Sequence, residues 1–206
     1  MKYGVIDVGS NSVRLMLSDG TNTLYKKVKT TRLAEAMGEE LILKPQAIER
    51  TAHAVSFFKN QAQSDGADII YAFATASVRQ AVNGQEFVNK VKSICGLSVE
   101  IISGQTEAML GVKGALNGKD GAIIDIGGAS TEIIVTSGGI TTYCKSINTG
   151  VVKIKDAVGQ DAEKVENFVE QKIDEFDKVP QSEFFGIGGT ATSLAGMMLE
   201  LEPYEQ

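Results

Sequence analysis

Residues 125–132 combine two carboxylates with glycines and hydroxyl groups in one short segment. Asp125 ends an apolar run, two glycines, Ala129 and two hydroxyl residues follow, and Glu132 opens a second apolar run. This order predicts a strand, a tight turn and a second strand. The backbone N–H groups of such a turn are uncrowded by side chains and can surround an anion, and its two carboxylates can hold a hydrated cation. The segment therefore suits a phosphorylated ligand accompanied by a divalent metal.

A second segment of the same kind follows the apolar run at residues 3–6. It starts at Asp7 and continues through a Gly/Ser/Asn turn into residues 13–18, where apolar and polar side chains alternate as in a strand. A repeat of this length indicates a duplicated domain rather than a solenoid, and a matched pair of turns favours a function over two ordinary turn-forming aspartates. A single shift of the chain, without a gap, places Asp7, Gly9 and Ser12 on Asp125, Gly127 and Ser130.

The remaining sequence predicts an α/β fold in which each half begins with an antiparallel meander and continues with helix and strand units. We expect one domain at 1–118 and a second at 119–206, with the phenylalanines at 57–58 and 184–185 in their cores. Two similar domains facing each other would bring both turns to one cleft. The predicted strands are residues 3–6, 13–18, 23–28, 69–73, 97–102, 119–124, 132–136, 140–147 and 184–187, and the predicted helices are residues 45–66, 87–96, 104–117, 162–176 and 193–201.

Composition narrows the choice of partners and compartment. The net charge is −6 and no basic block occurs, which argues against nucleic acid as a partner. The two cysteines, Cys95 and Cys144, lie far apart in the sequence, and so small a number is typical of proteins from reducing compartments. No signal peptide or apolar run of about 20 residues is recognised. A cytoplasmic protein without a membrane partner is therefore expected. His53 is the only histidine, which disfavours a His-dependent metal site or triad.

Five segments of the chain combine small, hydroxyl and charged residues: residues 7–15, 74–81, 103–108, 125–132 and 186–192. In this order they resemble the exopolyphosphatase and guanosine-pentaphosphate phosphatase family of the actin, Hsp70 and sugar-kinase superfamily. They extend over the whole chain, and five motifs in order are far more specific than one Gly-rich loop. The resemblance implies duplicated actin-like (ribonuclease H-like) domains with mixed five-stranded sheets and a ligand cleft between them. It also implies that the second domain lacks the C-terminal elements usual in the family.

The resemblance further implies hydrolysis of terminal phosphoanhydride bonds in polyphosphate or guanosine pentaphosphate, with Mg²⁺ or another divalent cation. Glu107 would then be the catalytic base, although by itself it is an ordinary carboxylate in the first turn of a predicted helix. Asp7, Asp125 and Glu132 would bind the metal. The residues expected to bind phosphate are Gly9, Ser10, Asn11, Ser12, Arg79, Gly127, Gly128, Ala129, Ser130, Gly188, Gly189 and Thr190.

Two positions depart from the family pattern. Ala129 stands where a third glycine is usual and is expected to tighten the turn, and Lys153 stands where arginine is frequent. Two other functions stay open: a nucleotide-binding ATPase or kinase of the same superfamily, with residues 186–192 contacting adenosine, and a catalytically weak regulator that binds guanosine tetraphosphate. Self-association into a homodimer is also left open. The densest basic group, which would serve a long anion or simply form a solvated strand face, is Lys26, Lys27, Lys29 and Arg32.

Overall fold

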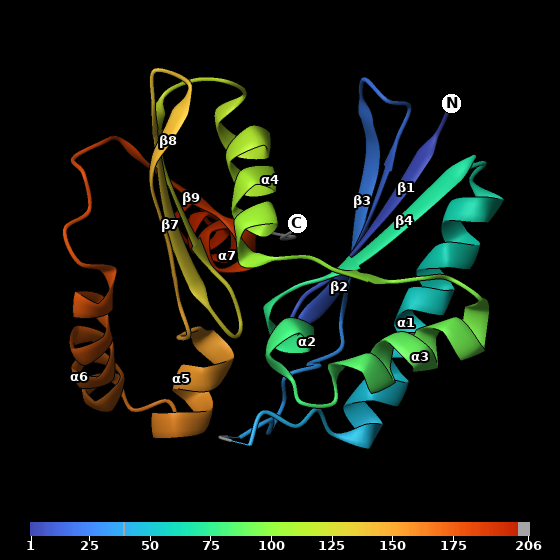
Figure 1. Cartoon of the computed structure of the whole chain (residues 1–206), viewed down its shortest axis with the longest axis horizontal. Helices are drawn as coiled ribbons and strands as arrows, with labels where there is room; N and C mark the ends of the chain where they lie inside the picture. Colours follow the sequence, from blue (N-terminus) through green and yellow to red (C-terminus); the bar gives the residue numbers. More distant parts are fainter. Residues whose placement is uncertain (39, 202–206) are drawn as a thin grey trace. The chain divides into compact units, whose positions relative to one another are not determined.

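The computed structural model describes residues 1–38 and 40–201. The chain divides into two compact units, Met1–Ser103 and Gly104–Gln206, each with its own mixed sheet (Figure 1). This boundary precedes the one at 118/119 that the repeat suggested. The difference arises because helix α4 (Gly104–Leu116) packs on the second sheet, where its Ala108 and Leu116 share a core cluster with Ile123 and Ile134.

The first unit is an α/β unit built on a five-stranded sheet in the order β3-β2-β1-β4-β5. Strand β1 is antiparallel to β2 and parallel to β4. Alternate residues of β1 and β2 are buried, among them Ile6, Val8 and Leu15, which are fully inaccessible to solvent. Its elements are β1 (Tyr3–Val8), β2 (Ser12–Ser18), β3 (Thr23–Thr30), α1 (Pro45–Ser64), β4 (Ile69–Ala74), α2 (Ala76–Gln80), α3 (Gly84–Cys95) and β5 (Glu100–Ile101).

The second unit has a four-stranded sheet in the order β8-β7-β6-β9, so the expectation of five strands in both sheets is wrong for the described residues. In the first unit the fifth strand comes from the helix-strand pair α3–β5. In the second, no strand follows α7 within the part of the chain that the structure describes. Its elements after α4 are β6 (Gly121–Ile126), β7 (Thr131–Ser137), β8 (Ile140–Ile147), α5 (Val151–Val158), α6 (Ala162–Ile173), a 3₁₀ turn (Asp174–Phe176), β9 (Phe184–Ile187) and α7 (Gly188–Met198).

The predicted repeat is confirmed in the strand registers of the two meanders. Asp7 pairs with Arg14 across β1 and β2, and Asp125 pairs with Glu132 across β6 and β7. The second and third strands also carry an irregularity at matching places, between Leu17 and Ser18 in one unit and between Val135 and Thr136 in the other. Both turns therefore stand on equivalent scaffolds, and their chemical differences come from side chains.

Some apolar residues lie elsewhere than predicted. Phe58 is 2% exposed, whereas Phe57 is 52% exposed, and both Phe184 and Phe185 are exposed. The last two lie on β9, an edge strand whose outer side no described strand covers.

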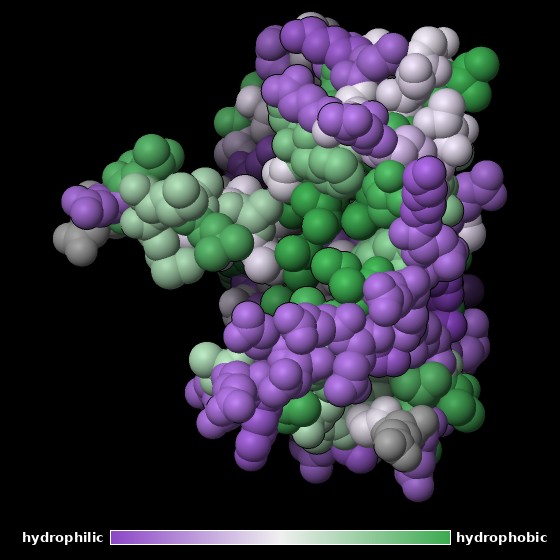
Figure 2. Space-filling model, turned by 90° about the vertical axis from the view of Figure 1, so that its left-hand side faces the viewer, coloured by the Kyte–Doolittle hydropathy of each residue, from purple (hydrophilic) through white to green (hydrophobic). Residues whose placement is uncertain are grey.

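Figure 2 shows an apolar area surrounded by hydrophilic side chains on the side of the molecule that it views. None of the helices in residues 1–38 and 40–201 combines the length and apolarity needed to cross a membrane.

Candidate phosphate-binding turns and carboxylate pair

The first turn joins β1 to β2 as a tight hairpin. The Gly9 amide donates to the Ser12 carbonyl over 3.0 Å. Two residues before the turn, the Asp7 carboxylate faces Arg14, whose Nη1 lies 3.3 Å from Asp7 Oδ2. Burial raises the pKa of Asp7, and the Arg14 guanidinium acts in the opposite direction. This turn is therefore flanked by a carboxylate that already has a cationic partner.

The carbonyl groups of this turn are held by the segment that follows β3. The amides of Thr31 and Arg32 donate to the Asn11 carbonyl over 2.9 and 2.8 Å, and the Ala34 amide donates to the Ser10 carbonyl over 2.9 Å. These carbonyl oxygens are thus occupied by protein donors and do not oppose an approaching anion. Asn11 is exposed, whereas the Ser10 side chain is buried.

The second turn is held by backbone hydrogen bonds of the same kind. The Gly127 amide donates to the Ser130 carbonyl over 2.9 Å, and the first amides of α5 donate to the carbonyls of Gly127 and Gly128 over 3.0 and 2.9 Å. Gly150 precedes α5 and approaches the turn closely, since a Cβ there would lie 2.6 Å from the Gly127 oxygen. In each unit the segment after the third strand therefore satisfies the carbonyls of the turn.

The amides at the tips of both turns point to anion binding. Within residues 1–38 and 40–201, the amides of Ser10, Asn11, Gly128 and Ala129 donate to no backbone carbonyl. Two successive N–H groups form a concave donor surface suited to a phosphate oxygen, and the carbonyls of Ser10, Asn11 and Gly128 are already bonded to protein amides. Ala129 has a buried side chain and does not adopt a positive φ. The alanine therefore fits this turn without backbone strain.

The two units differ in charge at equivalent positions. Glu132 of the second unit stands where the first unit has Arg14, so the cross-strand partner of Asp125 is another carboxylate. Glu132 is 5% exposed, and its Oε1 accepts a hydrogen bond from Ser146 Oγ at 2.6 Å. Like charges directly opposite each other destabilise a sheet. A cation bound between the two carboxylates would relieve that repulsion.

Asp125 also lies against the beginning of α7. Gly188 has φ +78°, and a Cβ at this position would overlap Asp125 Oδ1 and lie 3.2 Å from its Cγ. The position therefore requires glycine on two grounds, backbone conformation and space.

The remaining predicted residues are distributed over both units. Thr190 Oγ1 donates to the Ile126 carbonyl over 2.6 Å, which ties the start of α7 to the end of β6. Arg79 Nη1 donates to the Ile102 carbonyl over 3.0 Å. Glu107 lies in the first turn of α4 and is half-buried, next to the Ala108 that packs on the second sheet. The second unit thus carries Glu107, Asp125 and Glu132, and the first carries Asp7 and Arg79.

The donor set of the Asp125–Glu132 pair fits Mg²⁺, which binds oxygen ligands and is commonly held by one or two carboxylates together with waters and substrate phosphates. In the described part of the chain, no group of three or more His, Cys, Asp and Glu side chains is placed to hold a metal ion. The residues that the structure describes therefore offer a pair of carboxylates at this place rather than a closed cage. Such a pair suits a cation that shares its coordination with a phosphorylated substrate.

Sequence reasoning missed several residues that shape these turns. Gly150 and Ser146 were not singled out, because their importance depends on contacts with residues distant along the chain. Lys153 was noted only as a departure from the family. Its amide lies 3.3 Å from the Gly128 carbonyl, its Nζ bonds to Asn148 Oδ1, and burial lowers its pKa. The repeat could have drawn attention to the Arg14 and Glu132 positions, which it aligns.

A family model described as the Ppx/GppA phosphatase family matches residues 13–202. The chain belongs to this family. The Ppx/GppA enzyme of Aquifex aeolicus has a solved structure that is 30% identical, with a TM-score of 0.75, and the match covers 100% of this chain and 73% of that one. The predicted family is thereby confirmed, and the two turns described above are those of a member of a phosphatase family.

Two further solved structures support the fold of this Ppx/GppA family member. An exopolyphosphatase from Cytophaga hutchinsonii is 24% identical with a TM-score of 0.82, and the match covers 97% of this chain and 70% of that one. The ethanolamine utilization protein EutJ from Carboxydothermus hydrogenoformans is 17% identical with a TM-score of 0.55, covering 97% of this chain and 80% of that one. Together with the two mixed sheets, these similarities confirm the predicted actin-like α/β fold.

Proposed function

We propose that this Ppx/GppA family member is a Mg²⁺-dependent phosphohydrolase that removes terminal phosphates from polyphosphate or guanosine pentaphosphate. The observation that carries the proposal is the Asp125–Glu132 pair beside the second turn, at positions where the first unit has Asp7 and Arg14. A phosphoanhydride brings several negative charges and needs cations and N–H donors around it. Two similar solved structures are named as a Ppx/GppA enzyme and an exopolyphosphatase, which agrees with that class of substrate.

The protein would contribute three things to this hydrolysis. The amides at the tips of the turns, including those of Gly128 and Ala129, would bind phosphate oxygens. Asp125 and Glu132 would hold the cation, which when bound supplies charge neutralisation on the phosphate oxygens. Glu107 would accept the proton of the attacking water at a carboxylate oxygen. Arg14 is the cationic side chain beside the first turn and would add positive charge there.

The test measures phosphate release by the full chain with Mg²⁺ from three substrates: long-chain polyphosphate, guanosine pentaphosphate and ATP. Glu107→Gln preserves the size of the side chain and removes its basicity, so we expect it to lower kcat by about 100-fold or more. Turnover of ATP alone would favour an ATPase or kinase. A folded parent that binds guanosine tetraphosphate without turnover would favour a regulator. Either result would overturn the proposed hydrolysis.

A further inference from the structure

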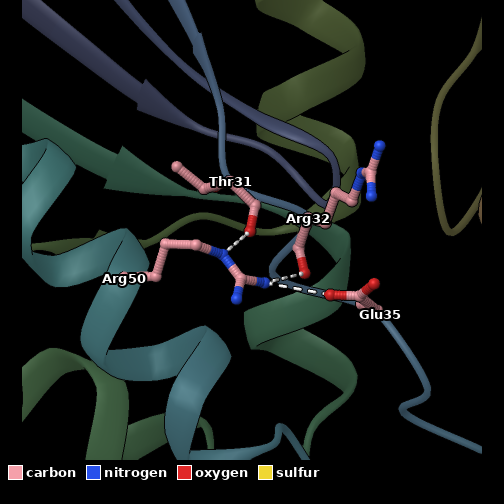
Figure 3. Close-up of polar contacts among 4 residues, drawn as sticks. All are labelled: Thr31, Arg32, Glu35 and Arg50. Carbon is pink, nitrogen blue, oxygen red and sulfur yellow. Dashed lines mark hydrogen bonds and ion pairs between the residues drawn. The ribbon is translucent and has the colours of Figure 1, made fainter.

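The segment that holds the first turn is itself held by one side chain. We call residues 31–35 the strap, because the amides of Thr31, Arg32 and Ala34 bind the carbonyls of Ser10 and Asn11. Arg50 of α1 reaches the strap from the other side. Its Nε donates to the Thr31 carbonyl over 2.6 Å, and its Nη2 donates to the Arg32 carbonyl over 3.3 Å (Figure 3).

The same Nη2 pairs with the Glu35 carboxylate over 3.1 Å, so one guanidinium joins three points of the strap. Figure 3 shows the Arg32 side chain directed away from Arg50 and Glu35. The planar fork of arginine can make such convergent bonds, whereas the ammonium of lysine acts as a point charge. Arg50 thus binds the Thr31 and Arg32 carbonyls with a single guanidinium group.

The strap needs such a restraint because its backbone is strained. Arg32 within the strap and Ala36 directly after it both have φ +50°, a left-handed conformation that is unfavourable for residues other than glycine. Strain of this kind persists only where the surroundings enforce it. Thr31 and Leu33 bury their side chains, and Arg50 fixes the carbonyls of Thr31 and Arg32.

We infer that Arg50 is a positioning residue for phosphate binding, acting on the first turn through the strap. This inference rests on the proposed function only for the identity of the ligand. Without Arg50 the amides of Thr31 and Arg32 would hold the Asn11 carbonyl less firmly. The tip amides of Ser10 and Asn11 would then be poorly oriented for a phosphate oxygen. The expected result is weaker substrate binding with little change in the chemical step.

The experiment compares Arg50→Gln and Arg50→Lys with Lys59→Gln as a matched control. Lys59 is also a cationic residue of α1, and its Nζ donates to the Cys95 carbonyl over 2.6 Å, far along the chain from the first turn. Hydrogen bonds to a charged donor are stronger than those between neutral groups, and losing them is expected to weaken binding by roughly tenfold or more. We therefore expect Arg50→Gln to raise KM for tripolyphosphate about tenfold with kcat within about threefold, Arg50→Lys to recover part of the loss, and Lys59→Gln to leave KM within about twofold.

A second readout does not depend on turnover. Hydrogen exchange of the Thr31, Arg32 and Ala34 amides should be about tenfold faster in Arg50→Gln than in the parent, and unchanged in Lys59→Gln. If the parent releases no phosphate, the proposed function fails, while amide exchange and direct binding of tripolyphosphate still test Arg50. The inference is overturned if Arg50→Gln leaves these amides protected, or if it speeds their exchange yet leaves the binding of tripolyphosphate unchanged.

Discussion

Replacing Gly188 by alanine places a methyl group against the Asp125 carboxylate and should displace it. Gly188 has φ +78°, and its Cβ would overlap Asp125 Oδ1. The backbone conformation alone costs about 1–2 kcal/mol for a residue other than glycine. The overlap adds to this cost, because the carboxylate must rotate or the start of α7 must move.

Gly138→Ala is the matched control for this change. Gly138 has φ +61° in the turn between β7 and β8, and nothing lies within 4 Å of a Cβ built there. Both variants therefore carry the conformational cost, and only Gly188→Ala carries the overlap. We expect urea denaturation to show a loss of about 1–2 kcal/mol for Gly138→Ala and a larger loss for Gly188→Ala.

The functional readout is the Mg²⁺ concentration needed for half-maximal phosphate release from polyphosphate. Displacement of Asp125 should raise that concentration about tenfold or more in Gly188→Ala, and Gly138→Ala should leave it unchanged. The reasoning is refuted if both variants lose the same stability and keep the parent's Mg²⁺ dependence. That outcome would mean that the Asp125 carboxylate tolerates the extra methyl group and that its position is not critical.

Two further substitutions test the turn and the choice of substrate. Ala129→Gly should leave kcat within about twofold and lower the free energy of unfolding by about 0.5–1 kcal/mol, because Ala129 has no positive φ and the glycine only adds freedom to the unfolded chain. A large gain in turnover would show that the alanine restricts the turn. Lys27→Gln with Lys29→Gln, on the exposed edge strand β3, should raise KM several-fold for long-chain polyphosphate and less than twofold for tripolyphosphate, with the difference shrinking at high salt. Equal effects on both substrates would exclude β3 as a track for a long anion.

The paired turns could be predicted from the sequence because the repeat consists of local residue patterns. Asp7 and Asp125 each end an apolar strand and precede a glycine, and the strand registers then place both on equivalent hairpins. The strands β1, β2, β6 and β8 were predicted for the same reason, since alternation and turn residues are local signals. The length of the repeat also led to the expectation of a duplicated α/β fold, which the two mixed sheets confirm.

Features that depend on contacts between distant residues could not be predicted in this way. Helix α5 was missed, and its role in holding the second turn is visible only from its amide contacts with Gly127 and Gly128. The exposure of Phe57 and Phe184 depends on which elements cover them, which hydrophobicity alone does not reveal. The contribution of Arg50 arises from backbone carbonyls, whose positions no side-chain pattern records.

The most direct test of the central proposal is a Mg²⁺ titration of phosphate release from polyphosphate by the parent and by Glu132→Gln. The substitution keeps the size of the side chain and an oxygen for Ser146 Oγ, and removes one of the two opposed charges. Loss of an outer-shell partner of a metal already costs about 10–100-fold in affinity or activity. We therefore predict that half-maximal release will require at least about tenfold more Mg²⁺. Release with an unchanged Mg²⁺ dependence in Glu132→Gln would contradict the account.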